Sequence, residues 1–155
     1  MTSNIELVKQ SKAIGLNLKL GDIMYQSELL DLALKPRMHL ILNIDKINSG
    51  GSHWVAFAVH GNKSIYIDSY GGYPCISVIK FCLKHNLQLG YSNYVCQSLD
   101  KTDNYCGQYS ILALNAVKHA NDIYIDGNIY VNEFAPNRIE NMQTLKNLLR
   151  EAQKP

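Results

Sequence analysis

The sequence predicts a single α+β domain in which a central mixed β-sheet of about four to five strands is packed by helices. Three observations support that class. The chain has 155 residues, a length that one hydrophobic core can serve. It is 46% hydrophobic, which is too apolar for a disordered chain. Strand-like and helix-like patterns are mixed along it without repeats, low-complexity tracts or linkers, so we expect residues 1–155 to form one domain.

Two helices are expected before the first clear strand. Ser3 and Glu6 have the spacing of a capping box, which predicts a short helix over residues 3–13. Leucines cluster in residues 22–34, and Pro36 stops any helix that contains them. The pattern therefore predicts a second helix from about residue 22 to residue 34.

Strand-like patterns follow in the middle of the chain. Residues 38–44 form a short, largely apolar run, and residues 48–52 have the composition of a loop. Two further strand-like runs cover residues 54–59 and 64–70. A Gly61-Asn62 dipeptide between them suits a two-residue hairpin turn.

The second half of the chain alternates between the two patterns. A break at Gly71-Gly72-Tyr73-Pro74 precedes an amphipathic helix, and a later helix is apolar nearly all round, which indicates that other elements bury it. An Asp-Gly pair predicts a small β-hairpin near the end. The expected elements are helix 76–84, strand 91–97, helix 106–119, hairpin 123–131 and helix 137–152.

Charge and hydropathy exclude several classes of protein. The formal net charge is +2, which gives no electrostatic argument for nucleic acid or for a membrane surface. No apolar run approaches the length of about 20 residues that a membrane span needs. The N-terminus lacks a basic segment followed by an apolar one, so we expect a soluble protein that is not secreted. We further expect it to be a monomer.

Four cysteines, Cys75, Cys82, Cys96 and Cys106, are better explained as reduced thiols than as disulfides or metal ligands. A chain of this size is stable without disulfides, and nothing indicates an oxidising compartment. No C-x-x-C pair is present, and no histidine has finger-like spacing to a cysteine, so we expect no metal and no cofactor. Most of the four should pack as small hydrophobic side chains.

The predicted hairpin brings a histidine and a carboxylate together. With Gly61-Asn62 as a two-residue turn, paired residues sum to 123, so His53 lies opposite Tyr70. Asp68 then lies on the same face as His53, within reach of a hydrogen bond to the imidazole. A three-residue turn would move Asp68 to the other face. In the first register, the carboxylate would orient the imidazole and stabilise its protonated form.

Cys106 begins the buried helix that is expected at 106–119. A thiol in the first turn faces the free N–H groups and the positive end of the helix dipole, which stabilise a thiolate. A nearby imidazolium would strengthen this effect. Gly107 leaves room for a substrate backbone, and both the N–H of Cys106 and the side chain of Gln97 could donate to an oxyanion. Each signal alone also has an ordinary structural explanation, such as a core histidine or an inert buried thiol.

Residues 50–58, Gly-Gly-Ser-His-Trp-Val-Ala-Phe-Ala, resemble the Gly-Gly-x-His-Trp-x-Ala-Phe-Ala segment of the adenain family of adenovirus maturation proteases. The order His-Trp, then a carboxylate on the next strand, then Gln, then Cys-Gly at a helix start is similar to the whole clan. That clan includes the SUMO and other ubiquitin-like deconjugating proteases. The resemblance covers roughly residues 38–119 and implies a papain-like active-site arrangement.

By resemblance, the implied catalytic residues are His53 as general base, Asp68 as the group that orients it, Gln97 as an oxyanion donor and Cys106 as nucleophile. Asp68 stands where adenain has Glu, but the deconjugating proteases use Asp there. Gln97 lies nine residues before Cys106 (106 − 97), which is about two or three residues more than is usual for the clan. Gln108 is a poor substitute for Gln97, because it follows the nucleophile into the helix.

The resemblance also implies which residues bind the substrate. Trp54 would cover the histidine and narrow the cleft, and Gly51 and Gly107 would line it, so cleavage next to small residues, especially Gly, is expected. Adenain also uses an activating peptide and DNA. No cysteine here matches its cofactor-linking cysteine, and the net charge of +2 gives no support to DNA, so both activators remain unproven for this chain.

Taken together, these features predict a cysteine endopeptidase, a viral maturation protease that cleaves capsid or other virion precursor proteins. We expect it in the virion and in the host-cell cytoplasm or nucleus. Three alternatives remain open: a SUMO or ubiquitin-like deconjugating protease, an acetyltransferase that uses the same three residue types, and an inactive binding module with the protease fold. The compact chain favours the viral protease, and the complete set of Cys106, His53 and Asp68 favours an enzyme.

Overall fold

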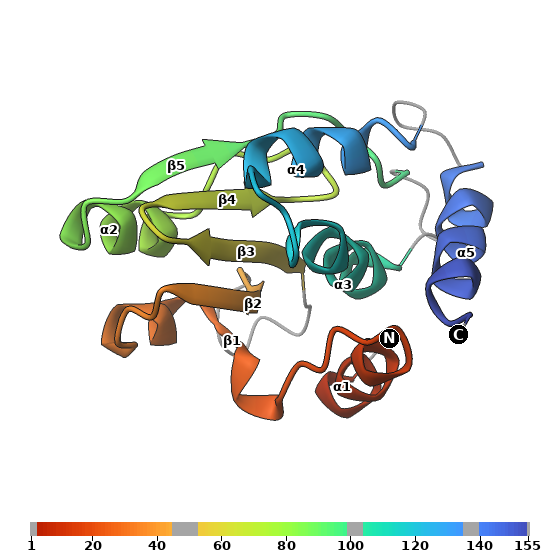
Figure 1. The fold of residues 1–155 in the computed structure, drawn as a ribbon, viewed down its shortest axis with the longest axis horizontal. Coiled ribbons are helices and arrows are strands. Elements are labelled where there is room, and N and C mark those ends of the chain that lie inside the picture. Colours follow the sequence, from red (N-terminus) through yellow and green to blue (C-terminus); the bar gives the residue numbers. More distant parts are fainter. Residues whose placement is uncertain (1–2, 45–52, 99–103, 135–139, 155) are drawn as a thin grey trace.

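The structure is a computed structural model that describes residues 3–44, 53–98, 104–134 and 140–154 (Figure 1). The expected loop at 48–52 and the first residues of the expected helix 137–152 lie outside these ranges. The helices are α1 (Asn4–Ala13), α2 (Ile76–Lys84), α3 (Cys106–Val117), α4 (Ile123–Val131) and α5 (Asn141–Ala152), with short 3-10 helices η1 (Leu20–Asp22) and η2 (Gln26–Asp31). The strands are β1 (Ile23–Tyr25), β2 (Arg37–Asn43), β3 (Trp54–His60), β4 (Lys63–Ile67) and β5 (Gln88–Tyr91).

The five strands form one mixed sheet in the order β1-β2-β3-β4-β5. The inner pairs β2–β3 and β3–β4 are antiparallel, and the outer pairs β1–β2 and β4–β5 are parallel. The fold is therefore α+β with a five-strand mixed sheet packed by helices, as the sequence predicts. Within the described ranges, no helix is both long and apolar enough to cross a membrane.

The predicted register of the central hairpin is confirmed. His60 pairs with Lys63 and Ala56 pairs with Ile67, so paired residues sum to 123. Gly61, in the two-residue turn, has a φ of +63°, a backbone conformation that glycine adopts without steric cost. Consequently the residues that flank the open end of the hairpin, His53 and Asp68, lie on one face.

Helices bury the sheet from both sides, so every residue of β3 from Trp54 to Val59 is buried. One face packs against α3 and α4, and its core includes Ala56, Ala58 and Ile65. The other face packs against α2 and η2 through residues such as Phe57. Figure 1 shows α3 beside β3, with α1 and α5 near it on its outer sides. This arrangement holds the first residue of α3 next to the start of β3.

The prediction of a helix at residues 22–34 is wrong. Ile23–Tyr25 instead forms strand β1, which pairs in parallel with Ile41–Asn43. The 3-10 helix η2 follows at once, and the carboxylate of Glu28 accepts a hydrogen bond from the N–H of Tyr25 at 2.8 Å. A long-range pairing with β2 thus overrides the local helical pattern.

The hairpin expected at 123–131 is also wrong, because these residues form helix α4. The carboxylate of Asp122 caps it by accepting hydrogen bonds from the N–H groups of Tyr124 and Ile125. Gly127 is not a turn residue. A Cβ at this position would lie 2.5 Å from the Cδ1 of Ile65, so glycine here lets α4 approach the sheet closely.

The strand expected at 91–97 lies earlier in the chain, at Gln88–Tyr91. Its last paired residue, Tyr91, stands opposite Tyr66, and β4 ends one residue later. Beyond that point β5 has no neighbour to pair with. The N–H groups of Cys96 and Gln97 instead donate to the carbonyl oxygen of Ser69, at 2.8 Å each.

Candidate active site

His53 and Asp68 form a close pair at the open end of the central hairpin. His53 directly precedes β3, and Asp68 directly follows β4. The Nε2 of His53 donates to the Oδ1 of Asp68 at 2.7 Å, and the two side chains are 16% and 6% exposed. A short hydrogen bond in a largely water-excluded place holds the ring in one orientation.

The backbone that follows Asp68 wraps around its carboxylate. Oδ1 also accepts the N–H of Tyr70 at 2.8 Å, and the carbonyl oxygen of Asp68 accepts the N–H of Gly71 at 2.7 Å. A Cβ on Gly72 would lie 2.6 Å from Oδ2. Gly71 has a φ of +70°, and a Cβ there would lie 2.5 Å from the backbone oxygen of Asn93. Two consecutive glycines are therefore needed for the chain to close on the carboxylate.

Cys106 is the first residue of α3 and is 8% exposed. Its side chain lies close enough to His53 to contribute to the raised pKa of the imidazole. The hydroxyl of Ser110, one turn later, lies 2.8 Å from the carbonyl oxygen of Cys106 and 3.2 Å from that of Trp54. Ser110 thus ties the start of α3 to the start of β3, which keeps the thiol beside the imidazole.

The electrostatics favour a charged imidazole at this place. Burial alone would lower the pKa of His53, but hydrogen bonds and charge interactions with Asp68 and Cys106 outweigh it and raise the pKa to about 9. His53 is therefore an imidazolium at neutral pH. Because Nε2 faces Asp68, the other ring nitrogen, Nδ1, is the one that can exchange a proton with the thiol.

The other three cysteines are also free thiols, but their surroundings differ. Burial raises the pKa of Cys75 and of Cys82. Burial, with a smaller contribution from the charge of Asp68, raises the pKa of Cys96 to about 12. None of the three is a thiolate near neutral pH. In the part of the chain that the structure describes, no three His, Cys, Asp or Glu side chains gather as a metal site would require.

Gln97 is 1% exposed and lies beside the residue that follows Asp68. Its Oε1 accepts a hydrogen bond from the hydroxyl of Ser69 at 2.7 Å. Gln108 instead faces helix α1, where its Nε2 donates to the Oε1 of Gln10 at 3.1 Å. Of the two glutamines, it is Gln97 that contacts Ser69, the residue next to Asp68.

The three residues predicted to bind substrate differ in where the structure places them. Gly51 lies outside the described residues. Trp54 is buried and lines a cavity of about 360 Å³ together with Asn4 and Asn43. Gly107 has a packing reason to be glycine, because a Cβ there would lie 2.8 Å from the Cδ2 of Leu7. For Gly51, Trp54 and Gly107, contact with a substrate stays a prediction.

Tyr70 is a site residue that sequence reasoning missed. Its ring lies 4.9 Å from that of His53, with an angle of 31° between the planes. The ring therefore covers one side of the imidazole, where an aromatic face favours the cationic form. The same hairpin register that places Asp68 also places Tyr70 opposite His53, so the signal was present in the sequence.

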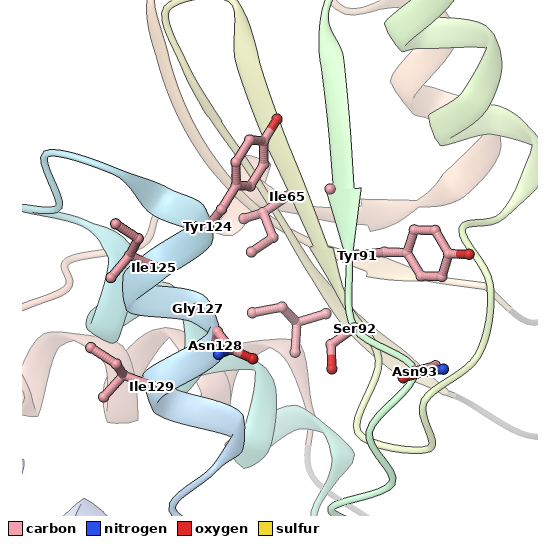
Figure 2. Close-up of a pocket in the computed structure, with 11 residues that line it drawn as sticks. Ile65, Tyr91, Ser92, Asn93, Tyr124, Ile125, Gly127, Asn128 and Ile129 are labelled. Carbon is pink, nitrogen blue, oxygen red and sulfur yellow. The ribbon is translucent and has the colours of Figure 1, made fainter.

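A separate cavity of about 540 Å³ lies between α4 and the edge of the sheet (Figure 2). Figure 2 shows Tyr124, Ile125 and Ile129 on the helix side and Tyr91 and Ser92 on the strand side. None of the predicted site residues lines it. The candidate chemistry therefore belongs to the start of α3 and the open end of the hairpin, not to this cavity.

Comparison with solved structures finds a similar fold in the crystal structure of selenomethionine ASFV pS273R protease. The TM-score is 0.58 with 16% sequence identity, and the match covers 96% of this chain. The chain spans 66% of the length of that protease. No family model and no curated protein sequence matches this chain. At this identity the likeness shows a shared fold.

Proposed function

We propose that the chain is a cysteine endopeptidase of viral origin. The single observation that supports this most is the arrangement of three side chains: Cys106 at a helix start, His53 beside it, and Asp68 bonded to the far side of the ring at 2.7 Å. A nucleophile, a base and a group that orients the base are the three parts of a nucleophilic hydrolase site. The shared fold with ASFV pS273R protease agrees with this proposal.

In the proposed first step, the thiolate of Cys106 attacks the carbonyl carbon of the scissile peptide bond. The electron pair of the C=O bond moves to oxygen, and the N–H of Cys106 and the side-chain amide of Gln97 donate to that oxyanion. As the tetrahedral intermediate collapses, the C–N bond breaks and the imidazolium of His53 gives its proton to the leaving amine. The product is a thioester on Cys106 and a neutral His53.

In the second step, His53 takes a proton from a water molecule as that water attacks the thioester carbon. The same donors stabilise the second oxyanion, and collapse releases the acid and restores the thiolate–imidazolium pair. Asp68 holds the ring with Nε2–H toward itself throughout and so keeps Nδ1 available to the reacting groups.

The substrates we propose are capsid or other virion precursor proteins, cut next to small residues such as Gly. This part rests on the resemblance of residues 50–58 to the adenain family, which implies that Trp54 narrows the substrate cleft. We further propose that the enzyme acts as a monomer, without metal or organic cofactor, in the virion or at the site of virus assembly. A ubiquitin-like deconjugating protease is the alternative that the same three side chains would serve.

Co-expression with candidate virion proteins tests the proposal. New protein termini, mapped by mass spectrometry, should appear with the wild type and be absent with Cys106→Ala. Cys82→Ala removes another buried thiol, in the core cluster on the other face of the sheet, and is the matched control, which should process the substrates normally. A parallel co-expression with ubiquitin-like precursors separates the two candidate functions. If wild type and Cys106→Ala give identical termini in both experiments, the protease proposal is wrong.

A further inference from the structure

Ser69 connects the carboxylate side of the site to Gln97. It directly follows Asp68 in the chain and is buried. Its hydroxyl donates to the Oε1 of Gln97 at 2.7 Å, and its carbonyl oxygen accepts the N–H groups of both Cys96 and Gln97 at 2.8 Å. One serine therefore holds Gln97 by its backbone and by its side chain.

The hydroxyl determines which end of the Gln97 amide faces which way. The carbonyl oxygen and the NH₂ group of a glutamine lie on opposite sides of the terminal carbon. With Oε1 directed to Ser69, Nε2 is directed to the other side. The orientation of the Gln97 amide matters for catalysis. An NH₂ group stabilises a developing oxyanion, whereas a carbonyl oxygen in its place repels it.

We propose that Ser69 is a positioning residue that orients the side-chain amide of Gln97 so that its NH₂ group can donate to the oxyanion. This inference rests on the proposed function, because it assigns Ser69 a part in the same reaction. Ser69 acts only through Gln97 and contacts no reacting atom.

The loop that carries Gln97 does not depend on this hydroxyl. Its backbone is held by the carbonyl oxygen of Ser69, which any residue at that position supplies. From the other side, the Nδ2 of Asn141, the first residue of α5, donates to the carbonyl oxygen of Cys96 at 2.7 Å. Ser69→Ala thus removes the contact with the amide and leaves both backbone anchors in place.

Hydrolysis of a peptidyl-Gly-Gly-aminomethylcoumarin substrate by Ser69→Ala, Ser69→Thr and Ser64→Ala measures the effect. Ser69→Ala should lower kcat about tenfold with KM unchanged, since the Gln97 amide is then no longer held in the orientation that donates to the oxyanion of the transition state. Ser69→Thr keeps the hydroxyl and should recover most of the activity. Ser64 is equally buried, and its hydroxyl donates to the carbonyl oxygen of Gln88 at 2.7 Å, so Ser64→Ala is the matched control with wild-type kcat.

Two further measurements distinguish a role of Ser69 in orienting Gln97 from an indirect effect in which the substitution disturbs the neighbouring Asp68. Alkylation of Cys106 by iodoacetamide needs the thiolate but forms no oxyanion, so Ser69→Ala should react at the wild-type rate. Combined with Gln97→Ala, which should lower kcat about 10²–10³-fold, Ser69→Ala should add no further loss.

The outcomes are distinct. Wild-type kcat in Ser69→Ala, an additional loss in the double variant, or slowed alkylation would each overturn the role of Ser69 and leave the protease proposal intact. If the wild type hydrolyses neither this amide nor the corresponding p-nitrophenyl ester, the proposed function itself fails, and the role of Ser69 fails with it.

Discussion

Strand β3 has a histidine at each end, and the two ends have opposite electrostatics. His53, just before the strand, meets a carboxylate and a thiol, and its pKa rises to about 9. His60 is the last residue of the strand. Its Nε2 shares a hydrogen bond of 2.9 Å with the Nε2 of His39, and its Nδ1 lies 3.4 Å from the guanidinium of Arg37. Burial, the charge of His60 and then that of Arg37 lower the pKa of His39 to about 4.

The difference shows that partners, not the strand or the residue type, decide what a histidine can do. Burial lowers the pKa at both ends. At the His53 end, Asp68 and Cys106 reverse that effect, whereas at the His60 end Arg37 adds to it. One end therefore holds an imidazolium beside a thiol at neutral pH, and the other holds a neutral pair suited to packing. Four experiments test this comparison.

Removal of each histidine should have the largest and most unequal effect. We expect His53→Ala to lower kcat/KM for the fluorogenic Gly-Gly substrate by about 10²–10⁴-fold, the range for a general acid–base group. His60→Ala, at the other end of the strand, should stay within about twofold of wild type once folding is verified by circular dichroism. Similar losses in the two variants would show that the two ends do not differ in function.

Asp68→Asn should have the next largest effect, about 10²-fold in kcat, because the ring loses the partner that orients and charges it. The pH profile carries the sharper test. Asp68 raises the pKa of His53, so activity that depends on the imidazolium should decline at high pH near the pKa of about 9. In Asp68→Asn this alkaline limb should move to lower pH. An unmoved alkaline limb would contradict the assignment of Asp68.

Iodoacetamide near pH 6 should label Cys106 at least about tenfold faster than the other cysteines, because an imidazolium stands beside it. Burial raises the pKa of Cys75, Cys82 and Cys96, which keeps them protonated and slow. Peptide mapping after brief exposure measures all four sites in one sample. The preference should vanish in His53→Ala and persist in His60→Ala. Equal labelling of four sites in the wild type would refute the activated thiolate.

The smallest effects concern stability, and the two ends should respond to opposite changes of pH. For His39 the folded pKa, about 4, lies below the usual 6.5, so the unfolded chain binds the extra proton and stability falls as pH drops from 6.5 to 4. For His53 the folded pKa, about 9, lies above 6.5, so stability falls as pH rises from 6.5 to 9.

Urea unfolding midpoints across pH measure both slopes. His39→Gln should flatten the acid side only, and His53→Gln should flatten the alkaline side only. His119 is exposed, and His119→Gln is the control that should leave both slopes as they are. Crossed effects, with His39→Gln acting on the alkaline side, would contradict the electrostatic difference between the two ends.

The hairpin was the part of the fold most open to prediction from sequence. A two-residue turn determines which residues face each other, and that is enough to bring Asp68 to His53 at 2.7 Å. The same pairing predicts Tyr70 as the neighbour of the His53 ring, but it does not predict that the two rings stack. Local rules work here because both strands and their turn are adjacent in the chain.

Elements that depend on distant neighbours were not predictable in the same way. Asp126-Gly127 looks like a hairpin turn, yet Gly127 is small because Ile65 of β4 comes within contact of α4. Residues 23–25 form a strand only because they pair with the edge of β2. The contact of Ser69 with Gln97 joins residues 28 positions apart. The segment that carries Gln97 is irregular, so it has no hydrophobic periodicity from which this contact could be predicted.

The short turn at Gly61 has a consequence for the order in which the site forms. Asp68 and His53 are only 15 residues apart and are joined by a local hairpin, so little loop-closure entropy opposes their meeting. Cys106 joins them only when α3 docks on β3 from much further along the chain. A growing or partly unfolded chain can therefore hold His53 and Asp68 as a pair before Cys106 reaches them, so the three side chains come together only when the last long-range contact is made.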